Sequence, residues 1–204
     1  MNFRAKEIIF ILLKKTTKLF YSLICLILLS NIVQAGSIRG LDGFEQHKID
    51  ASKNANSHNG MGNIYFDEKN YNAAFQEYKI AYDLTKNTPS GAPYLYNMAR
   101  CMIKFNNYKQ AQNLIEAAIK KDCTNIVYYS ALVDCYIAQN TYQKELEHYL
   151  SDYKNPYNRI IAGLIYLKTE QKIEAKIIFD EFINDNPDMI ITQDIRQILR
   201  ELKQ

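Results

Sequence analysis

Side chains that perform catalysis or bind metal ions are few and scattered in this chain of 204 residues. Its three histidines, His47, His58 and His148, have no cysteine or carboxylate at the spacing of a metal site. The chain also lacks the zinc-binding motif H-E-x-x-H, any C-x-x-C pair and any nucleophile elbow. Catalysis needs several titratable groups that converge on one place. The sequence therefore predicts no catalytic residue, no metal site and no cofactor, and a protein that is not an enzyme.

Gly60, Met61 and Gly62 begin like a glycine-rich dinucleotide-binding loop. A loop of that kind follows a β-strand and has a third glycine three residues later. Here Tyr65 occupies the third position, and no strand-like run precedes the glycines. We therefore expect both glycines to be helix-packing residues.

The chain has four cysteines, of which Cys25 lies in an apolar segment near the amino terminus. The other three, Cys101, Cys123 and Cys135, are odd in number, so at least one thiol stays free or pairs with another molecule. Their apolar surroundings are typical of helices and favour buried free thiols over a structural disulfide. Spacing alone does not decide between the two.

The segment 1–35 has the parts of an export signal. Basic residues between Arg4 and Lys18 precede a nearly unbroken apolar run at 19–33, and the segment ends in a small-residue cleavage site at Ala35. The apolar run makes a helix about 22 Å long, which is short of a hydrocarbon core of about 30 Å. We predict cleavage near Ala35 and a secreted or periplasmic protein. The alternative is an uncleaved anchor through 19–33 that holds the remainder outside the cytoplasm.

The net charge of +3 arises from this leader. Residues 1–35 contain five basic residues and one acidic residue, which leaves 20 basic and 21 acidic residues in the rest of the chain. A nearly neutral chain has no basic surface for phosphates, so nucleic acid is not an expected partner.

The chain after residue 35 is expected to be helical, so helices must position its functional residues. Four prolines and seven glycines are few for a chain of this length, and the long intervening runs favour helix. Apolar residues recur in these runs at three- and four-residue steps, which gives each helix one apolar stripe.

A frame of seven residues recurs four times, at offsets of 37, 34 and 30 residues. In its first occurrence a large residue and a small one, Met61 and Gly62, are followed by an aromatic residue. A small residue and a second aromatic then come after a short polar turn. The third occurrence departs from this pattern. The four sets are Met61, Gly62, Tyr65, Tyr71, Ala74, Tyr78 and Ala81; Met98, Ala99, Met102, Tyr108, Ala111, Ile115 and Ala118; Leu132, Val133, Tyr136, Tyr142, Glu145, Tyr149 and Asp152; and Ala162, Gly163, Tyr166, Lys172, Ala175, Phe179 and Phe182.

This frame resembles the tetratricopeptide repeat. The resemblance implies an all-α, right-handed superhelical solenoid of about four helix pairs over residues 51–189. A capping helix over 190–204 would cover the last pair, since the end of a solenoid must hide its apolar face. Residues 36–50, which are rich in glycine and have no clear period, are interpreted as a linker.

The resemblance also implies a binding surface, because in this family the first helix of each pair lines a concave groove that holds a peptide or partner protein. Asn63 and Asn97 stand where peptide-binding members use asparagine to bond a ligand backbone, and Arg100 and Lys104 could meet an acidic group. Residues of the chaperone-type carboxylate clamp are absent. The implied groove residues are Asn59, Asn63, Phe66, Tyr96, Asn97, Arg100, Lys104, Ser130, Asp134, Tyr157, Ile160, Leu164 and Leu167.

Two alternatives stay open for these residues. Arg100 and Lys104 could belong to an ordinary solvated helix face. The apolar set from Tyr157 to Leu167 could be buried under the terminal helix or could serve self-association.

The sequence thus predicts an exported adaptor that binds a peptide or partner protein in its groove, for envelope assembly or scaffolding. One alternative is a membrane-tethered structural subunit that uses its convex face, and an enzyme accessory role is a further one.

Overall fold

Asparagine starts many of the helices. The side-chain oxygens of Asn54, Asn70, Asn107, Asn125 and Asn155 each accept a hydrogen bond from a backbone N–H in the first turn of the following helix. These bonds satisfy amide groups that have no partner inside the helix. Asparagine favours helix only weakly, but in this chain it sets where many of the helices begin.

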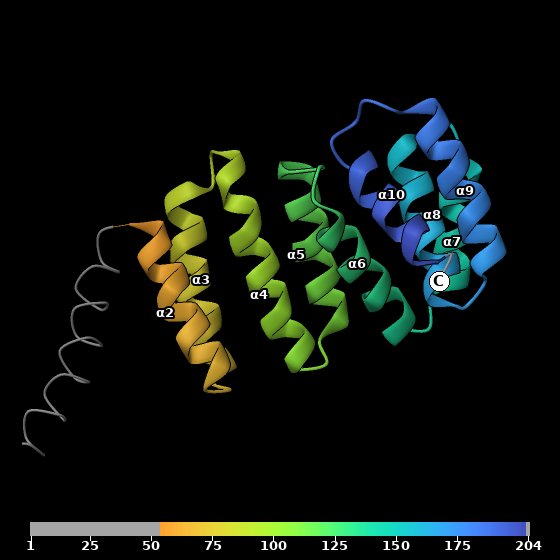
Figure 1. Cartoon of the computed structure of the whole chain (residues 1–204). Coiled ribbons are helices and arrows are strands. Elements are labelled where there is room, and N and C mark those ends of the chain that lie inside the picture. Colours follow the sequence, from red (N-terminus) through yellow and green to blue (C-terminus); the bar gives the residue numbers. More distant parts are fainter. Residues whose placement is uncertain (1–53, 203–204) are drawn as a thin grey trace, which may run out of the picture. The chain divides into compact units, whose positions relative to one another are not determined.

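The protein is described here from a computed structural model, which describes residues 54–202. The predicted leader (1–35), the linker (36–50) and residues 51–53 of the predicted solenoid lie outside this range. Within it the chain contains α-helices, one short 3₁₀ helix and no strand, which confirms the all-α prediction (Figure 1). The helices are α2 (Ala55–Asp67), α3 (Tyr71–Thr85), η1 (Pro89–Gly91), α4 (Ala92–Lys104), α5 (Tyr108–Lys121), α6 (Ile126–Ala138), α7 (Tyr142–Ser151), α8 (Pro156–Lys168), α9 (Lys172–Asp185) and α10 (Thr192–Glu201).

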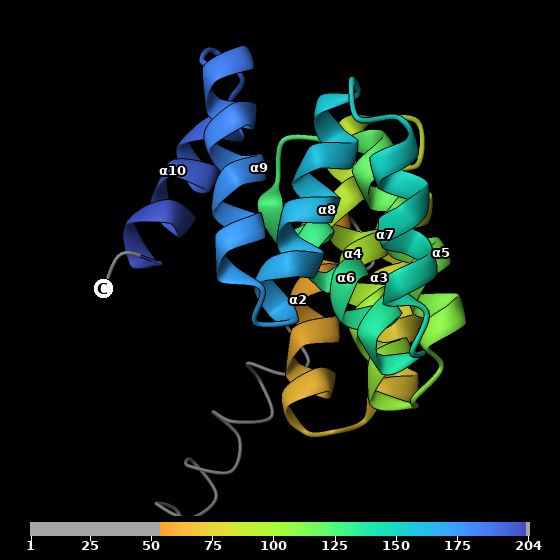
Figure 2. The same ribbon diagram turned by 90° about the vertical axis from the view of Figure 1, so that its right-hand side faces the viewer.

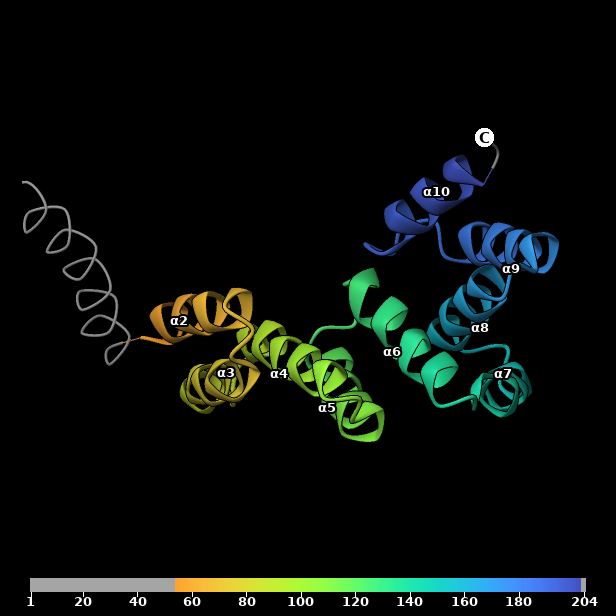
Figure 3. The same ribbon diagram turned by 90° about the horizontal axis from the view of Figure 1, so that it is seen from below.

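The helices form four consecutive pairs that stack side by side, followed by α10. Seen end-on, α2, α4, α6 and α8 lie along one side of the stack, and α3, α5 and α7 lie along the other (Figure 3). Figure 2 shows the carboxyl-terminal end, where α9 lies between α8 and α10. The predicted solenoid of helix pairs is therefore confirmed for residues 54–202. None of the helices in this range is long and apolar enough to cross a membrane.

The turns inside the pairs repeat with the register of the sequence frame. Lys69, Asn106, Asn140 and Glu170 have positive φ angles between 55° and 63°. These four positions are 37, 34 and 30 residues apart, like the frames. In each turn the next residue donates its N–H to a carbonyl five positions back, as in the first pair, where Asn70 bonds to Tyr65 at 2.8 Å. This is the Schellman closure of a helix, so each first helix ends in the same way.

A small residue on the first helix lets the paired helices approach closely. A Cβ added to Gly62 would lie 2.5 Å from the Tyr78 ring, and one added to Gly163 would lie 2.3 Å from the Phe179 ring. At Gly60 an added Cβ would meet nothing within 4 Å. The helix-packing interpretation is therefore correct for Gly62 and wrong for Gly60.

The third pair, α6 and α7, departs from the pattern as expected. Val133 occupies the position that Gly62 holds in the first pair, and the large Tyr149 occupies the position of Tyr78. The α7 helix has only 10 residues, none of them fully buried, and ends at Ser151, before the last position of the frame. A hydroxyl–hydroxyl bond of 2.7 Å between Tyr136 and Tyr149 joins the two helices instead. The helices of this pair contact each other less extensively than those of the other three pairs.

The terminal helix α10 begins at Thr192, two residues later than the predicted cap. Ile191, Ile195 and Leu199 are buried, so this segment covers the last pair as the predicted cap should. Ile190, the first residue of the predicted cap, precedes the helix and is 73% exposed.

Candidate functional site

The face of the stack formed by α2, α4, α6 and α8, toward which α10 turns, is here called the concave face (Figure 3). It comprises a polar part on α2 and α4 and an apolar part on α6, α8 and α10. Of the implied groove residues, Asn59, Asn63 and Arg100 belong to the polar part, and Leu164 and Leu167 belong to the apolar part.

In the polar part, side chains of successive repeats bond to one another. Asn97 Nδ2 donates to Asn59 Oδ1 at 2.8 Å, and Tyr94 Oη donates to Asn56 Oδ1 at 2.9 Å. Both pairs are 38 residues apart in sequence. Asn59 and Asn97, which the resemblance assigned to a ligand, therefore bond to each other and join α2 to α4.

Arg100 lies over the Phe66 ring, with its guanidinium carbon 4.2 Å from the ring centroid. It also donates to Asn97 Oδ1 at 3.2 Å. Lys104, one turn further along α4, is exposed. Among residues 54–202, no carboxylate lies within 4.0 Å of either cation.

Asn63 is exposed, but its oxygen is already engaged. Tyr78 Oη donates to Asn63 Oδ1 at 2.8 Å, across the first helix pair. Burial raises the pKa of Tyr78 to about 12, so its hydroxyl remains a donor over the physiological range. This bond takes one of the two acceptor positions of the Asn63 oxygen, so Asn63 has fewer groups left for a ligand than its residue type suggests.

Tyr96 also has a neighbour within the protein. Its ring is half-buried, and its centroid lies 5.2 Å from that of Tyr128 on α6. It therefore contributes to packing between the second and third pairs as well as to the concave face.

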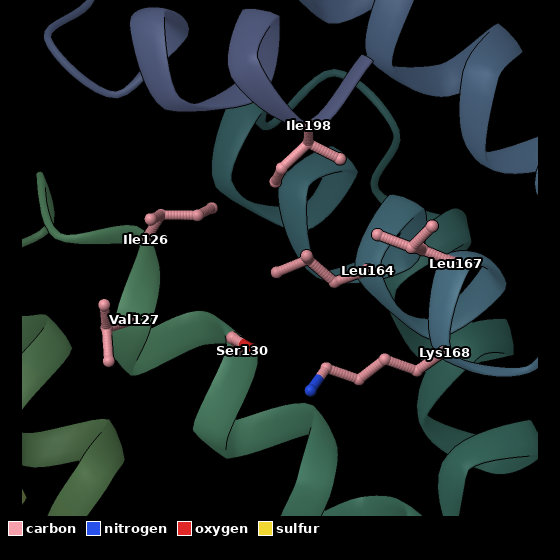
Figure 4. A pocket seen from close by; sticks show the side chains of 7 residues that line it. All are labelled: Ile126, Val127, Ser130, Leu164, Leu167, Lys168 and Ile198. Carbon is pink, nitrogen blue, oxygen red and sulfur yellow. The ribbon is translucent and has the colours of Figure 1, made fainter. Parts of the chain in front are cut away.

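The apolar part of the concave face contains an open pocket of about 450 Å³ (Figure 4). The side chains point into it from three helices, with one hydroxyl and one ammonium group among aliphatic groups. Val127, at its edge, is 46% exposed. The lining residues are Ile126, Val127, Ser130, Leu164, Leu167, Lys168 and Ile198.

One ion pair spans the rim of this pocket. Lys168 Nζ on α8 lies 2.5 Å from Asp134 Oδ1 on α6, and the two side chains are 25% and 57% exposed. A pair this exposed contributes little to stability, about 0–1 kcal/mol. Its effect is to fix the ammonium group at the edge of the pocket.

The other predicted residues of the fourth repeat have different environments. The prediction of a ligand contact is wrong for Ile160, which is fully buried and therefore a core residue. On an amphipathic helix, some residues of the apolar stripe always face the core. Leu164 is 2% exposed and forms the floor of the pocket. Tyr157 stacks on Tyr129, with centroids 6.3 Å apart, and its hydroxyl lies 3.1 Å from Cys123 Sγ.

The sequence prediction missed part of the pocket. Ile126, Val127, Lys168 and Ile198 were not among the predicted groove residues. The signal for Ile198 was present, since it belongs to the apolar stripe of the terminal helix yet lies between Ile195 and Leu199. Its half-exposed position depends on the angle at which α10 leaves α9, which no local pattern encodes.

Within residues 54–202 no three histidine, cysteine, aspartate or glutamate side chains come together at a metal-binding distance. His58 Nδ1 pairs with Glu77 Oε2 at 2.7 Å, between α2 and α3. Burial raises the pKa of Cys101 and of Cys135 to about 11, so both thiols stay protonated at neutral pH.

No protein-family model and no curated protein sequence matches this chain. Solved structures give remote similarities. Pseudomonas aeruginosa pilF matches at a TM-score of 0.46 and 15% identity, over 72% of this chain and 67% of its own. A tetratricopeptide repeat protein from Parabacteroides merdae matches at 0.46 and 16%, over 73% and 60%. YrrB, described as a TPR protein with an unusual peptide-binding site, matches at 0.42 and 16%, over 77% and 87%. Similarities of this size say nothing about what this chain binds.

Proposed function

We propose that this solenoid of tetratricopeptide-type helix pairs is an exported adaptor, which holds a segment of a partner protein on its concave face for envelope assembly or scaffolding. The observation that carries the proposal is the open apolar pocket between α6, α8 and α10, beside the polar surface of α2 and α4. Apolar surface that stays open to water in a folded protein commonly marks an interaction site.

The polar part supplies specificity in this proposal. Arg100 is held between Phe66 and Asn97, so little side-chain entropy is lost when it binds an acidic group. Lys104 adds a second positive charge one turn away. An acidic residue in the partner segment would then bind α4 while apolar residues of the same segment enter the pocket.

Photo-cross-linking in the cells that make the protein tests which face is used. A photoreactive amino acid placed at Lys104 or Val127, both exposed on the concave face, is expected to give adducts with one partner. The matched control positions are Asn113 on α5 and Ile177 on α9, which are exposed on the second helices of their pairs. Adducts from the control positions alone would contradict the proposal and support a structural subunit that uses its convex face.

Export rests on the leader pattern in residues 1–35. Cleavage near Ala35 would leave Gly36 as the first residue of the exported protein. Amino-terminal sequencing is expected to find Gly36 in the secreted or periplasmic fraction. An intact Met1 in the membrane fraction would instead support the tethered alternative through residues 19–33.

A further inference from the structure

The pocket on the concave face offers few hydrogen-bonding groups to a ligand. Its lining has one hydroxyl, on Ser130, and one ammonium group, on Lys168, and the ammonium already pairs with Asp134. At the start of α6, the N–H of Val127 bonds to Asn125 Oδ1 and that of Tyr128 to the Asn125 carbonyl. The remaining backbone groups of the three helices are largely bonded within them.

The scarcity of hydrogen-bonding groups in the pocket favours an α-helical ligand over an extended one. An extended segment carries one N–H and one C=O per residue, and these groups lose free energy if they leave water without new partners. An α-helix bonds the same groups internally and can present a dry apolar stripe. The volume of about 450 Å³ also exceeds what one aliphatic side chain fills, and a helix offers several such chains one turn apart.

The charged residues around the pocket indicate which charges a partner helix should have. Asp194 and Glu201 lie one turn before and one turn after Ile198 on α10, so they share its face. Asp134 stands on the opposite rim, 57% exposed, and Lys168 is the single cation of the lining. Asp134 is already paired with Lys168, and Arg196 and Arg200 are each two residues from Ile198, so they lie on another side of α10. The excess negative charge of Asp194 and Glu201 therefore favours basic groups on the flanks of a ligand.

We infer that this pocket receives one amphipathic α-helix of a partner protein, with an aliphatic stripe in the pocket and lysine or arginine along its flanks. The inference rests on the proposed use of the concave face and adds the class of segment that binds at its α6–α8–α10 end.

A synthetic probe tests the inference on the full exported chain. The probe is a fluorescein-labelled peptide of leucine and lysine, with leucines along one helical face. A length of about 14 residues leaves an isolated helix marginal in water, so binding should raise its helical circular dichroism signal. Fluorescence anisotropy measures the affinity. Two further peptides serve as comparisons, one of the same composition with leucines around the whole helix, and one with glutamate in place of lysine.

Val127→Glu is the decisive protein variant, and Ile173→Glu is its matched control. Val127 is 46% exposed and Ile173, on α9, is 74% exposed, so both changes leave the core intact. The added carboxylate at Val127 would attract a basic probe, so weaker binding isolates the loss of apolar contact. We expect Val127→Glu to weaken binding at least about tenfold and Ile173→Glu to leave it unchanged.

Several outcomes overturn the inference. They are equal affinity for the peptide with scattered leucines, no effect of Val127→Glu, and no gain of helix on binding. Equal affinity of the glutamate peptide overturns the basic character of the partner. If a photoreactive residue at Lys104 still gives adducts with a partner but the helical peptide does not bind, the proposed function stands. Only the inference of a helical partner segment is then wrong.

Discussion

Replacing Gly163 with alanine is expected to destabilise the protein by about 1–3 kcal/mol, although alanine is the better helix former. The new Cβ would lie 2.3 Å from Cε1 of Phe179, well inside van der Waals contact. Phe179 is fully buried, so its ring can move only by displacing other core residues. Urea unfolding followed by circular dichroism measures the change.

Gly60→Ala is the matched control, because an added Cβ there meets nothing within 4 Å. It should stabilise the protein by up to about 1 kcal/mol, which is the helix-propensity difference between glycine and alanine. Two glycine-to-alanine changes in first helices are thus expected to have opposite signs. A stabilising Gly163→Ala would contradict the close-approach explanation.

A double variant tests the pairing itself. The second repeat uses Ala99 and Ile115 at the two positions, both fully buried. Gly163→Ala combined with Phe179→Ile reproduces that combination in the fourth repeat. The double variant should be more stable than the sum of the two single effects predicts, since the smaller side chain removes the clash. Additive effects would mean that the two residues do not interact as described.

Stability is expected to fall steeply as the pH rises above 9. Burial raises the pKa of Cys101 and of Cys135 from 9.0 to about 11, and that of Tyr78 from 10.0 to about 12. In the unfolded chain these groups lose their protons at their ordinary pKa values, whereas in the folded protein they keep them. Their contribution to the free energy of unfolding is therefore complete below pH 9 and is lost as the pH rises through the pKa values of the folded protein. Each group costs about 1.4 kcal/mol of stability per pH unit inside its own window.

Urea midpoints measured between pH 8 and pH 11 check this expectation. Cys135→Ala should lower stability at pH 8, because it removes a buried sulfur atom, and should make the decline above pH 9 shallower. A decline as steep as that of the unchanged protein would show that this thiol does not contribute to the pH dependence.

The order of residues along the chain is enough to predict the helix pairs and their register. Turn residues such as Lys69 and Asn106 fall at the frame offsets, and the small residue Gly62 stands where its helix meets Tyr78. The third frame, which departs from the pattern in sequence, is also the pair whose helices contact each other least. These features follow from periods of three and four residues and from local turn chemistry, which the order of residues along one helix pair specifies.

The composition of the candidate site, by contrast, depends on how the repeats pack against one another. Asn59 and Asn97 belong to different repeats and bond to each other, which leaves fewer groups for a ligand than their types suggest. Ile160 and Val127 are both aliphatic residues of first helices, yet one is fully buried and the other 46% exposed. The pocket exists because α10 turns Ile198 toward α6 and α8. Contacts of this kind depend on the angles between helices, and those angles are set by the packing of residues that lie 30 or more positions apart.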